Sequence, residues 1–398
     1  TAVNTETGEV NSSKGIHCGG DVEIAGGKLT IDAAEDGVNC TGSLELQAGE
    51  VDVTSAEDGI QADGDLTVSG GAVTITTTGT VAASAQDDFQ PNNFGGGNFG
   101  GNGNIPPDNA DNRQNAAASD ASAIPAAAMQ STADSSTDAG ASAAAAMTTA
   151  AEDATSKGIK CGGNLTMSGG SCTIDSTDHA VHAAGTAVFS GTTLEITSDN
   201  KGISSHGDLE ISGGDITIHS CTEGVESKAE MTISGGNVRI LDASDDGLNT
   251  GGSDSGSYAM TITGGTLLAL SSKGMMEYPE SGCLIATNCN AAAGEQISIV
   301  DKNGTVLATL QSPKAVSDVI YGIGDSDSAD YTIVTGGTYD GTLNEDGYGE
   351  GGSVSGGTEV TANGGTGSMN GGAPAGGGQG GTPPEMPNLN NSGGNTAS

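Results

Sequence analysis

The sequence contains no tryptophan, and only 3% of its 398 residues are aromatic. A single conventional globular core of this size would normally use more aromatic bulk, so the composition argues against one. Glycine is abundant instead, with 68 residues. Because glycine permits tight turns, the composition indicates many short elements joined by sharp corners.

Basic side chains are also scarce: 11 Lys and Arg face 51 Asp and Glu, for a net charge of −40. No basic surface exists to replace the counterions around phosphates, which argues against nucleic acid as a partner. The same charge argues against an anionic membrane surface. A chain this acidic repels itself unless cations intervene, so composition raises bound calcium as a hypothesis, with a solvated acidic surface as the alternative.

Long apolar runs are missing too. No stretch approaches the ~18–20 residues that span a bilayer, and no charged-then-apolar leader opens the sequence. We therefore expect no membrane insertion, and either a cytosolic protein or one whose signal peptide has been removed. The seven cysteines leave at least one unpaired within the chain, so cysteine content does not decide between these compartments.

One phrase recurs along the chain. Residues 13–32 read SKGIHCGGDVEIAGGKLTID, and residues 156–175 read SKGIKCGGNLTMSGGSCTID. A glycine recurs every 22 residues at Gly15, Gly37 and Gly59, and the same spacing continues at Gly158, Gly202 and Gly224, with Ala180 at the equivalent position between the first two of these. A register held this tightly indicates stacked structural units.

Each unit carries five apolar positions that alternate with polar residues in two places, which is typical of strands. In the first unit these positions are Ile16, Val22, Ile24, Leu29 and Ile31. The alternating runs are short and end at glycine, so a unit becomes three short strands and three turns. We predict an all-β fold: a right-handed single-stranded parallel β-helix of about eight 22-residue coils, stacked at ~4.8 Å, with a C-terminal β cap.

The periodic and aperiodic stretches divide the chain into five parts. In the cap, the segment QISIVDKNGTVLATL predicts a hairpin that turns at Asn303-Gly304. The cap is expected to cover strand edges that would otherwise promote aggregation. The parts are coils one to three (13–78), a disordered low-complexity insertion (79–154), coils four to eight (155–272), the β cap (273–340) and a Gly-rich flexible tail (341–398).

Acidic residues stand directly before the repeating glycine in several units, at Glu35, Asp36, Glu57, Asp58, Glu223, Asp245 and Asp246. Because equivalent positions stack, carboxylates of adjacent coils are expected ~5 Å apart. Calcium, which takes several oxygen ligands, would relieve the repulsion; solvated Asp-Gly turns are the alternative. In three other units Lys14, Lys157 or Lys201 replaces the acidic residue, and a lysine there can neutralise the acidic edge without a metal.

The sequence resembles the clostridial-type calcium-binding β-helix carbohydrate-binding domain, which is related in fold to pectate lyases. The resemblance rests on SKGIK with its GG-bounded strands, TEGVES at 222–227, SDDGLNTGGSDS at 244–255, and TGGTLLALSSKGM at 263–275 leading to ADYTIVTGG. It covers roughly residues 13–340 and implies a secreted or cell-surface protein that binds acidic polysaccharide with calcium. It also implies Glu223, Glu226, Asp245 and Asp246 as metal ligands.

The middle coils depart from this family pattern. They read DHAVH at 178–182 and NKGIS at 200–204, so His179 and Lys201 stand where relatives carry carboxylates. Asp178 stays a metal candidate. His179 and His182 are either ligands of a softer metal or, as we favour, structural residues.

The seven cysteines leave the disulfide pairing open. Cys18 and Cys40 share one position in adjacent coils, where small-residue packing is the simpler explanation than a bridge. Cys283 and Cys289 in the cap are the better disulfide candidates.

Three functions remain open at this point. We favour a secreted, non-catalytic protein that binds a polysaccharide such as polygalacturonate or cellulose with calcium as cofactor. A structural or adhesive extracellular rod without glycan affinity is the first alternative. A polysaccharide lyase is the second, but it needs a strong base, and only Arg113, in the insertion, and Arg239, with no evident partner, are available. We therefore predict no catalytic residues.

Overall fold

The computed structural model describes residues 2–3, 10–11, 13–79, 156–251, 258–273, 277–279, 281–324 and 326–364. All of these lie in one compact unit, formed by residues 1–81 and 155–398. The predicted insertion, apart from residue 79, lies outside the described residues, as do the SDSGS segment at 253–257 and the chain beyond residue 364. Within the described residues, no helix has the length and apolar character needed to cross a membrane.

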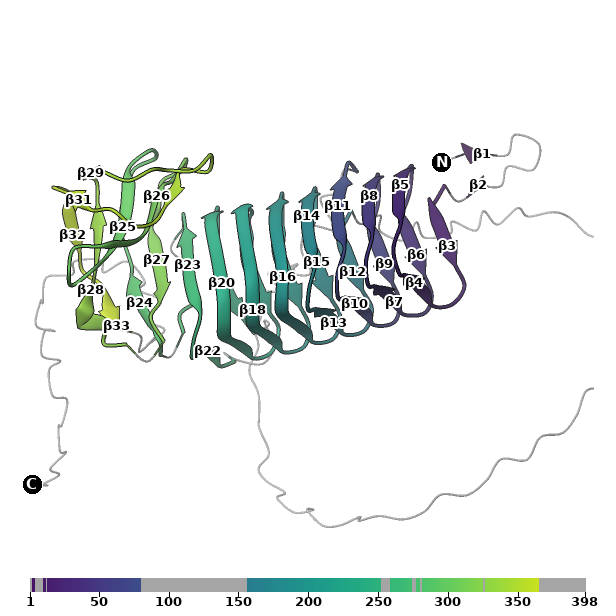
Figure 1. Cartoon of the computed structure of the whole chain (residues 1–398), viewed down its shortest axis with the longest axis horizontal. Helices are drawn as coiled ribbons and strands as arrows, with labels where there is room; N and C mark the ends of the chain where they lie inside the picture. Colours follow the sequence, from purple (N-terminus) through teal and green to yellow (C-terminus); the bar gives the residue numbers. More distant parts are fainter. Residues whose placement is uncertain are drawn as a thin grey trace, which may run out of the picture. The chain divides into compact units, whose positions relative to one another are not determined.

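The first sheet of the solenoid contains one short strand from each coil, in parallel register (Figure 1). Ile16 pairs with Val38, and Val38 pairs with Ile60, which reproduces the 22-residue spacing. The strands of this eight-stranded sheet are β3 (Ile16–Cys18), β6 (Val38–Cys40), β9 (Ile60–Ala62), β12 (Ile159–Cys161), β15 (Val181–Ala183), β17 (Lys201–Ser205), β19 (Glu223–Ser227) and β21 (Leu248–Thr250).

The other two strands of each coil belong to a second sheet. One series is β4 (Val22–Ile24), β7 (Leu44–Leu46), β10 (Leu66–Val68), β13 (Leu165–Met167) and β22 (Met260–Ile262). The other is β5 (Lys28–Ala33), β8 (Glu50–Ser55), β11 (Ala72–Thr77), β14 (Ser171–Ser176) and β23 (Thr266–Ser271). Three long strands contribute to both series: β16 (Ala187–Ser198), β18 (Leu209–Ser220) and β20 (Met231–Ala243).

The third and fourth coils stack directly on each other although 99 residues separate their equivalent positions. Ile60 pairs with Ile159, and Ile75 pairs with Ile174, in the same parallel register as the neighbouring coils. Because the register is unbroken, the solenoid continues as one stack across the gap between residues 79 and 156. The predicted right-handed parallel β-helix is confirmed.

The apolar positions of the repeat form the core. From the second coil onward they are buried to within a few per cent, including Val38, Leu44 and Leu46, and Phe189 is the largest fully buried side chain. In the first coil Ile31 is buried, whereas the other four apolar positions, such as Ile16, are only partly buried. At roughly 1.5–3 kcal/mol per buried aliphatic side chain, this column is the main favourable term in the stability of the solenoid.

The repeating glycine is required by close packing between coils. A Cβ on Gly37 would lie 2.2 Å from Val53 Cγ1 and 2.5 Å from the Gly59 carbonyl oxygen, so no larger side chain fits. The second glycine of each GG pair has a different role. Gly71, for example, has a φ of 88°, which L-residues rarely adopt, and it makes the sharp corner between two strands.

The cap begins where the pairing becomes antiparallel. β23 pairs with β27 (Asp318–Gly322), which also pairs with β24 (Cys283–Ala286), and β24 pairs with β33 (Asn363–Gly364). A separate antiparallel sheet has the order β30 (Tyr348–Gly349), β26 (Val306–Gln311), β25 (Gln296–Asp301), β28 (Tyr331–Thr335) and β32 (Thr358–Val360). The predicted hairpin at Asn303-Gly304 is confirmed, because it joins β25 to β26.

Small elements complete the described part. A two-residue antiparallel pair, β1 (Ala2–Val3) and β2 (Val10–Asn11), precedes the first coil. In the cap, η1 (Ser328–Asp330) leads into β28, and β29 (Thr338–Tyr339) pairs with β31 (Val354–Ser355).

The prediction of a tail from residue 341 onward is wrong for residues 341–364. These residues belong to the cap, because β30 to β33 join it and Tyr348, Val354 and Val360 pack against its apolar clusters. The candidate disulfide between Cys283 and Cys289 is not formed, since all seven cysteines are free. Cys283 packs into the solenoid core whereas Cys289 packs into the separate core of the cap, so the two face different interiors.

Candidate functional site

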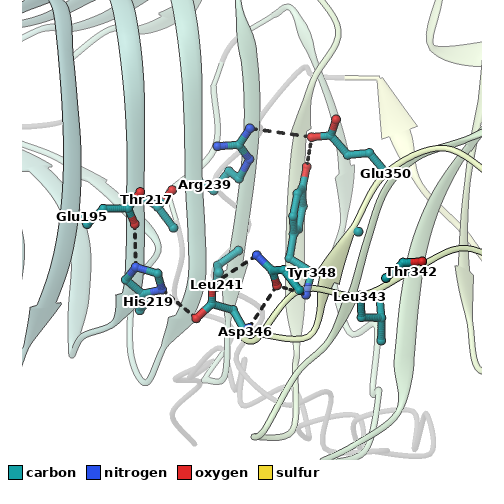
Figure 2. Close-up of a pocket in the computed structure, with 12 residues that line it drawn as sticks. Glu195, Thr217, His219, Arg239, Leu241, Thr342, Leu343, Asp346, Tyr348 and Glu350 are labelled. Carbon is teal, nitrogen blue, oxygen red and sulfur yellow. Dashed lines mark hydrogen bonds and ion pairs between the residues drawn. The ribbon is translucent and has the colours of Figure 1, made fainter. Parts of the chain in front are cut away.

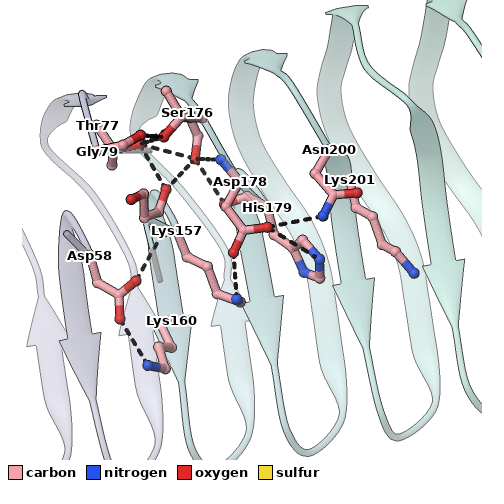
Figure 3. Close-up of polar contacts among 12 residues, drawn as sticks. Asp58, Thr77, Gly79, Lys157, Lys160, Ser176, Asp178, His179, Asn200 and Lys201 are labelled. Carbon is pink, nitrogen blue, oxygen red and sulfur yellow. Dashed lines mark hydrogen bonds and ion pairs between the residues drawn. The ribbon is translucent and has the colours of Figure 1, made fainter. Parts of the chain in front are cut away.

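The turn before the repeating glycine places buried carboxylates along one corner of the solenoid, which we call the acidic corner (Figure 3). Asp36, Asp58 and Asp178 are all buried there. Asp58 Oδ1 accepts a hydrogen bond from the Lys157 backbone N–H at 2.9 Å, one coil further along. Asn200 in turn donates to Asp178 Oδ1 at 3.0 Å. These carboxylates therefore also link adjacent coils.

Each of these three aspartates has an ammonium partner. Lys14 pairs with Asp36, Lys160 Nζ lies 2.9 Å from Asp58 Oδ2, and Lys157 Nζ lies 2.6 Å from Asp178 Oδ2. Burial by itself raises the pKa of Asp178, but neighbouring His179 and Lys157 outweigh it and the net effect lowers that pKa. Lys14 and Lys157 thus neutralise the corner as proposed from the repeat, and Lys160, which the repeat did not single out, does the same for Asp58. The oxygens of these three aspartates do not fit a calcium site.

Glu226 is neutralised in the same way from β19. It is 2% exposed, and its oxygens lie 2.7 Å from Lys201 Nζ and 2.6 Å from Lys228 Nζ. Ser204 Oγ adds a hydrogen bond of 3.0 Å. Burial alone would raise the pKa of Glu226, but Lys201 and Lys228 outweigh burial and lower the pKa to about 2. Both carboxylate oxygens are engaged, so Glu226 does not fit the metal role that the resemblance implied.

Glu35 and Glu57 occupy the outer part of the same corner. Glu35 Oε2 accepts a hydrogen bond from the Ser13 backbone N–H at 3.0 Å, which again joins equivalent turns 22 residues apart. Burial, followed by the nearby charges of Asp36 and Glu35, raises the pKa of Glu57. These two glutamates therefore lie close to the Lys14–Asp36 pair, where one ammonium serves several carboxylates.

The last acidic pair, Asp245 and Asp246, is neutralised least. Asp245 Oδ2 lies 3.1 Å from Lys273 Nζ, and Glu223 Oε2 lies 3.2 Å from Lys201 Nζ. Asp246 Oδ1 is buried without a hydrogen-bond partner. Burial, then the charges of Asp245 and Glu223, raises the pKa of Asp246 to about 7. This is the part of the acidic corner whose donor chemistry fits a hard cation.

The side chains around Asp245 and Asp246 provide only part of a metal site. Carboxylate oxygens are the ligands that calcium prefers, and the buried Oδ1 atoms of Asp245 and Asp246 make no hydrogen bond. However, across the described ranges, no three His, Cys, Asp or Glu side chains are arranged to hold a metal ion. Asp245 and Asp246 would thus be the first ligands of a calcium ion rather than a complete set.

The histidines of the middle coils form a small stack. The His179 and His182 ring centroids lie 5.5 Å apart, and His182 and His206 lie 5.0 Å apart. Burial lowers the pKa of His179 to about 3, against the opposing charge of Asp178, so this ring is neutral at physiological pH. The structural role that we favoured for His179 and His182 is consistent with this packing.

A pocket of about 520 Å³ lies where the outward face of the long strands meets the cap (Figure 2). β16, β18 and β20 contribute outward side chains such as Glu195, His219 and Arg239, and residues 342–350 form the opposite wall. The first wall follows from strand alternation, because residues between two buried positions point away from the core. The second wall belongs to the segment that was predicted to be tail, which is why sequence reasoning missed the pocket.

His219 joins the two walls of this pocket. Its Nε2 lies 2.6 Å from Glu195 Oε2, and its Nδ1 lies 2.9 Å from Asp346 Oδ1. Figure 2 shows the ring between these two carboxylates. Asp346 itself is held in its turn by Asn344, whose Oδ1 accepts the Asp346 backbone N–H at 3.0 Å. The imidazole therefore fixes the cap loop against β18.

Arg239 and Tyr348 form the other end of the pocket. The guanidinium carbon lies 5.3 Å from the Tyr348 ring centroid, within cation–π range. Arg239 Nη1 also donates to Asp215 Oδ1 at 2.5 Å, and its Nη2 lies 3.7 Å from Glu350 Oε1. Tyr348 Oη donates to Glu350. The expectation that Arg239 has no evident partner is therefore wrong.

One family model matches the chain over residues 1–57, 41–201 and 190–373, and it describes a carbohydrate-binding domain-containing protein. No curated protein and no solved structure matches the chain. The three matched segments together cover the solenoid and the cap. The chain therefore belongs to the family of carbohydrate-binding domain-containing proteins.

Proposed function

We propose that this protein binds a polysaccharide without cleaving it, and that the pocket between the solenoid and the cap holds the sugar. The observation that carries the proposal is the pocket itself. Its volume of about 520 Å³ falls within the range of roughly 300–1,000 Å³ for ligand sites. In this concave surface an aromatic ring and several hydrogen-bonding side chains meet.

The chemistry of the lining suits a sugar. A pyranose ring presents hydroxyl groups around its edge and C–H groups on its faces. Thr217, Asn344 and the carboxylates of Glu195 and Glu350 offer donors or acceptors for hydroxyls, and Tyr348 offers a flat aromatic side chain. Such a mixture gives orientation through hydrogen bonds and affinity through contact with the ring.

The outward face of the strand series that begins with β5 and includes β14 and β16 extends the pocket along the solenoid. Thr173 and Thr193, on β14 and β16, are exposed and point outward between buried residues. Because a solenoid repeats one surface at each coil, such a face suits an extended linear ligand. We therefore infer a polymer rather than a single sugar as the natural ligand.

Two features support binding without catalysis. Lyase chemistry requires a strong base, and Arg239 is the one arginine in the described residues. Burial tends to lower its pKa, but Tyr348 and Asp215 outweigh burial and raise it, so the guanidinium keeps its proton. Arg239 therefore serves better as a fixed cation that orients Tyr348 than as a base.

The test is glycan binding by wild type, Tyr348→Ala and Tyr348→Phe, measured by pull-down on insoluble polysaccharides and by calorimetry with soluble ones. Tyr348→Ala should weaken binding about tenfold or more, because it removes the ring. Tyr348→Phe keeps the ring and should retain most of the affinity. Glu210→Gln, on the opposite arm of β18, is the matched control.

Two outcomes would contradict the proposal. If wild type were retained on no glycan, the adhesive rod would be the better function. If absorbance detected unsaturated products, the protein would be a lyase.

A second candidate adds calcium, an acidic polysaccharide and an extracellular location. It is favoured by the buried, unpartnered Oδ1 of Asp246 beside Asp245. A calcium ion bound there would neutralise this end of the acidic corner and would offer a positive charge to a uronate. Retention on polygalacturonate that is lost with a chelator, and lost in Asp246→Asn, would support it; retention indifferent to both would contradict it. Fractionation of the producing cells tests secretion.

A further inference from the structure

The charges around the pocket are unevenly balanced. Four carboxylates, those of Glu195, Asp215, Asp346 and Glu350, face one guanidinium, Arg239, and one imidazole, His219. Even with His219 protonated, two negative charges remain. The net charge of −40 on the whole chain adds to the same potential rather than opposing it.

The negative groups are also the more accessible ones. The side chains of Glu350 and Asp215 are 56% and 48% exposed, and that of Glu195 is 39% exposed. Arg239 is only 20% exposed, because Asp215 and the Tyr348 ring cover its guanidinium. A ligand that enters the pocket therefore meets carboxylates first, while Arg239 and His219 already have carboxylate partners.

This arrangement selects against a uronate. A sugar carboxylate would have to lie among the three carboxylates that line the pocket, with Arg239 already shared between Asp215 and Glu350. A protonated amine has the opposite preference, because an ammonium group donates up to three hydrogen bonds and those to carboxylates are roughly twice as strong as neutral ones. An uncharged sugar gains neither advantage.

We propose that the pocket recognises glycans that carry a protonated primary amine, which means polymers of amino sugars. The proposal rests on the pocket being the glycan site. Glu350 and Glu195 are the specificity-determining residues, since each has an exposed carboxylate that lines the pocket from an opposite wall. Glu195 contacts His219 through Oε2, whereas Asp346 is held both by His219 and, through its backbone N–H, by Asn344, so Asp346 acts mainly to position the cap loop.

The test compares short soluble oligosaccharides by calorimetry: a glucosamine oligomer, its fully N-acetylated form and an oligogalacturonate of equal length. N-acetylation removes the charge while it keeps the ring and most of the shape. The free-amine oligomer should bind at least about tenfold more tightly than the acetylated one. Glu350→Gln and Glu195→Gln should each lose most of that difference, and each should weaken binding of the free-amine oligomer several-fold more than binding of the acetylated one, because glutamine keeps an acceptor oxygen for a hydroxyl but not the charge.

Nonspecific attraction of a polycation to an acidic protein is controlled in two ways. Glu210→Gln removes one exposed carboxylate outside the pocket, on β18, and should leave all affinities unchanged. The difference between the two glutamine variants and this control should also persist at 0.15 M salt, at which surface charges are screened within about 8 Å.

Each outcome separates this proposal from the proposed function. Equal affinity for the amine and acetylated oligomers, with loss of both in Tyr348→Ala, would overturn the amine preference and keep the pocket as a glycan site. Tighter binding of the oligogalacturonate would overturn it as well. An equal loss of amine binding in Glu210→Gln and Glu350→Gln would show general electrostatic attraction and overturn the assignment to the pocket. Binding of no oligosaccharide would remove both proposals together.

Discussion

The buried carboxylates of the acidic corner are neutralised by lysines in some coils and lack such a partner in another. In the coils that contain Asp58, Asp178 and Glu226, a lysine from the same or a neighbouring coil supplies the positive charge, within 2.9 Å of a carboxylate oxygen. In the last full coil, Asp246 has a buried oxygen without a partner, and its pKa is raised to about 7. Stacking therefore fixes where carboxylates gather, but the individual residues decide whether the neutralising cation is internal.

The largest effect should come from breaking the internal pair between Lys157 and Asp178. The two side chains are 11% and 1% exposed, so Lys157→Met leaves a buried carboxylate without its ammonium. Removing one partner of a buried pair costs about 3–5 kcal/mol, and we expect a loss in the free energy of unfolding on that order, measured by urea titration. The double variant Lys157→Met with Asp178→Asn should recover a large part of it. A loss as small as that of an exposed pair would contradict the role of Lys157.

Acid should weaken the lysine-paired coils next. The folded-state pKa of Glu226 is about 2, below its ordinary value, so its contribution to stability is complete above pH 4.5 and is lost as pH falls toward 2. A shift of this size corresponds to roughly 3 kcal/mol. Asp178, whose pKa is also lowered, adds to the same window. The urea concentration at the unfolding midpoint should decrease as the pH is lowered from 5 to 2. Glu226→Gln should lose less stability over that range than wild type.

The last coil should have the opposite pH dependence in the absence of calcium. A carboxyl with a raised folded-state pKa binds more protons in the folded state, so its contribution to stability falls as pH rises from about 4 to about 7. In chelator, the Tm should therefore be lower at pH 8 than at pH 5, and Asp246→Asn should reduce that difference. Calcium added at pH 8 should raise the Tm of wild type by several degrees, since a ligand that binds only the folded state stabilises it. If calcium did not change the Tm of wild type, Asp246 would be a buried carboxyl with a raised pKa rather than a metal ligand.

The sequence alone was sufficient to predict the solenoid, because its pattern of apolar residues repeats. Val38, Leu44 and their equivalents recur at one spacing and are buried, since each strand can satisfy its backbone only beside the same strand of the next coil. The same register showed that Lys14, Lys157 and Lys201 could neutralise the corner. It did not show which oxygens stay free, because that depends on turn conformations such as the one that buries Asp246 Oδ1.

The pocket was not predictable from that signal. The sequence showed no partner for Arg239, because its partners Tyr348 and Glu350 come from a glycine-rich stretch without periodicity. Composition indicated that the stretch turns often, and we interpreted it as tail. It joins the cap instead because β30 pairs with β26 and Tyr348 packs on the apolar cluster of the cap, a long-range pairing that no local pattern encodes.

The smallest effect should come from an ion pair with the same spacing but without burial. Lys28 on β5 and Glu50 on β8 are also 22 residues apart on adjacent coils, yet their side chains are 63% and 58% exposed. Water already solvates both groups, so the pair gains little from contact and salt screens it. Lys28→Ala should leave the urea midpoint within experimental error of wild type, at low and at high salt. A loss of stability in Lys28→Ala as large as that in Lys157→Met would mean that the spacing of the coils, rather than burial, determines the strength of these ion pairs.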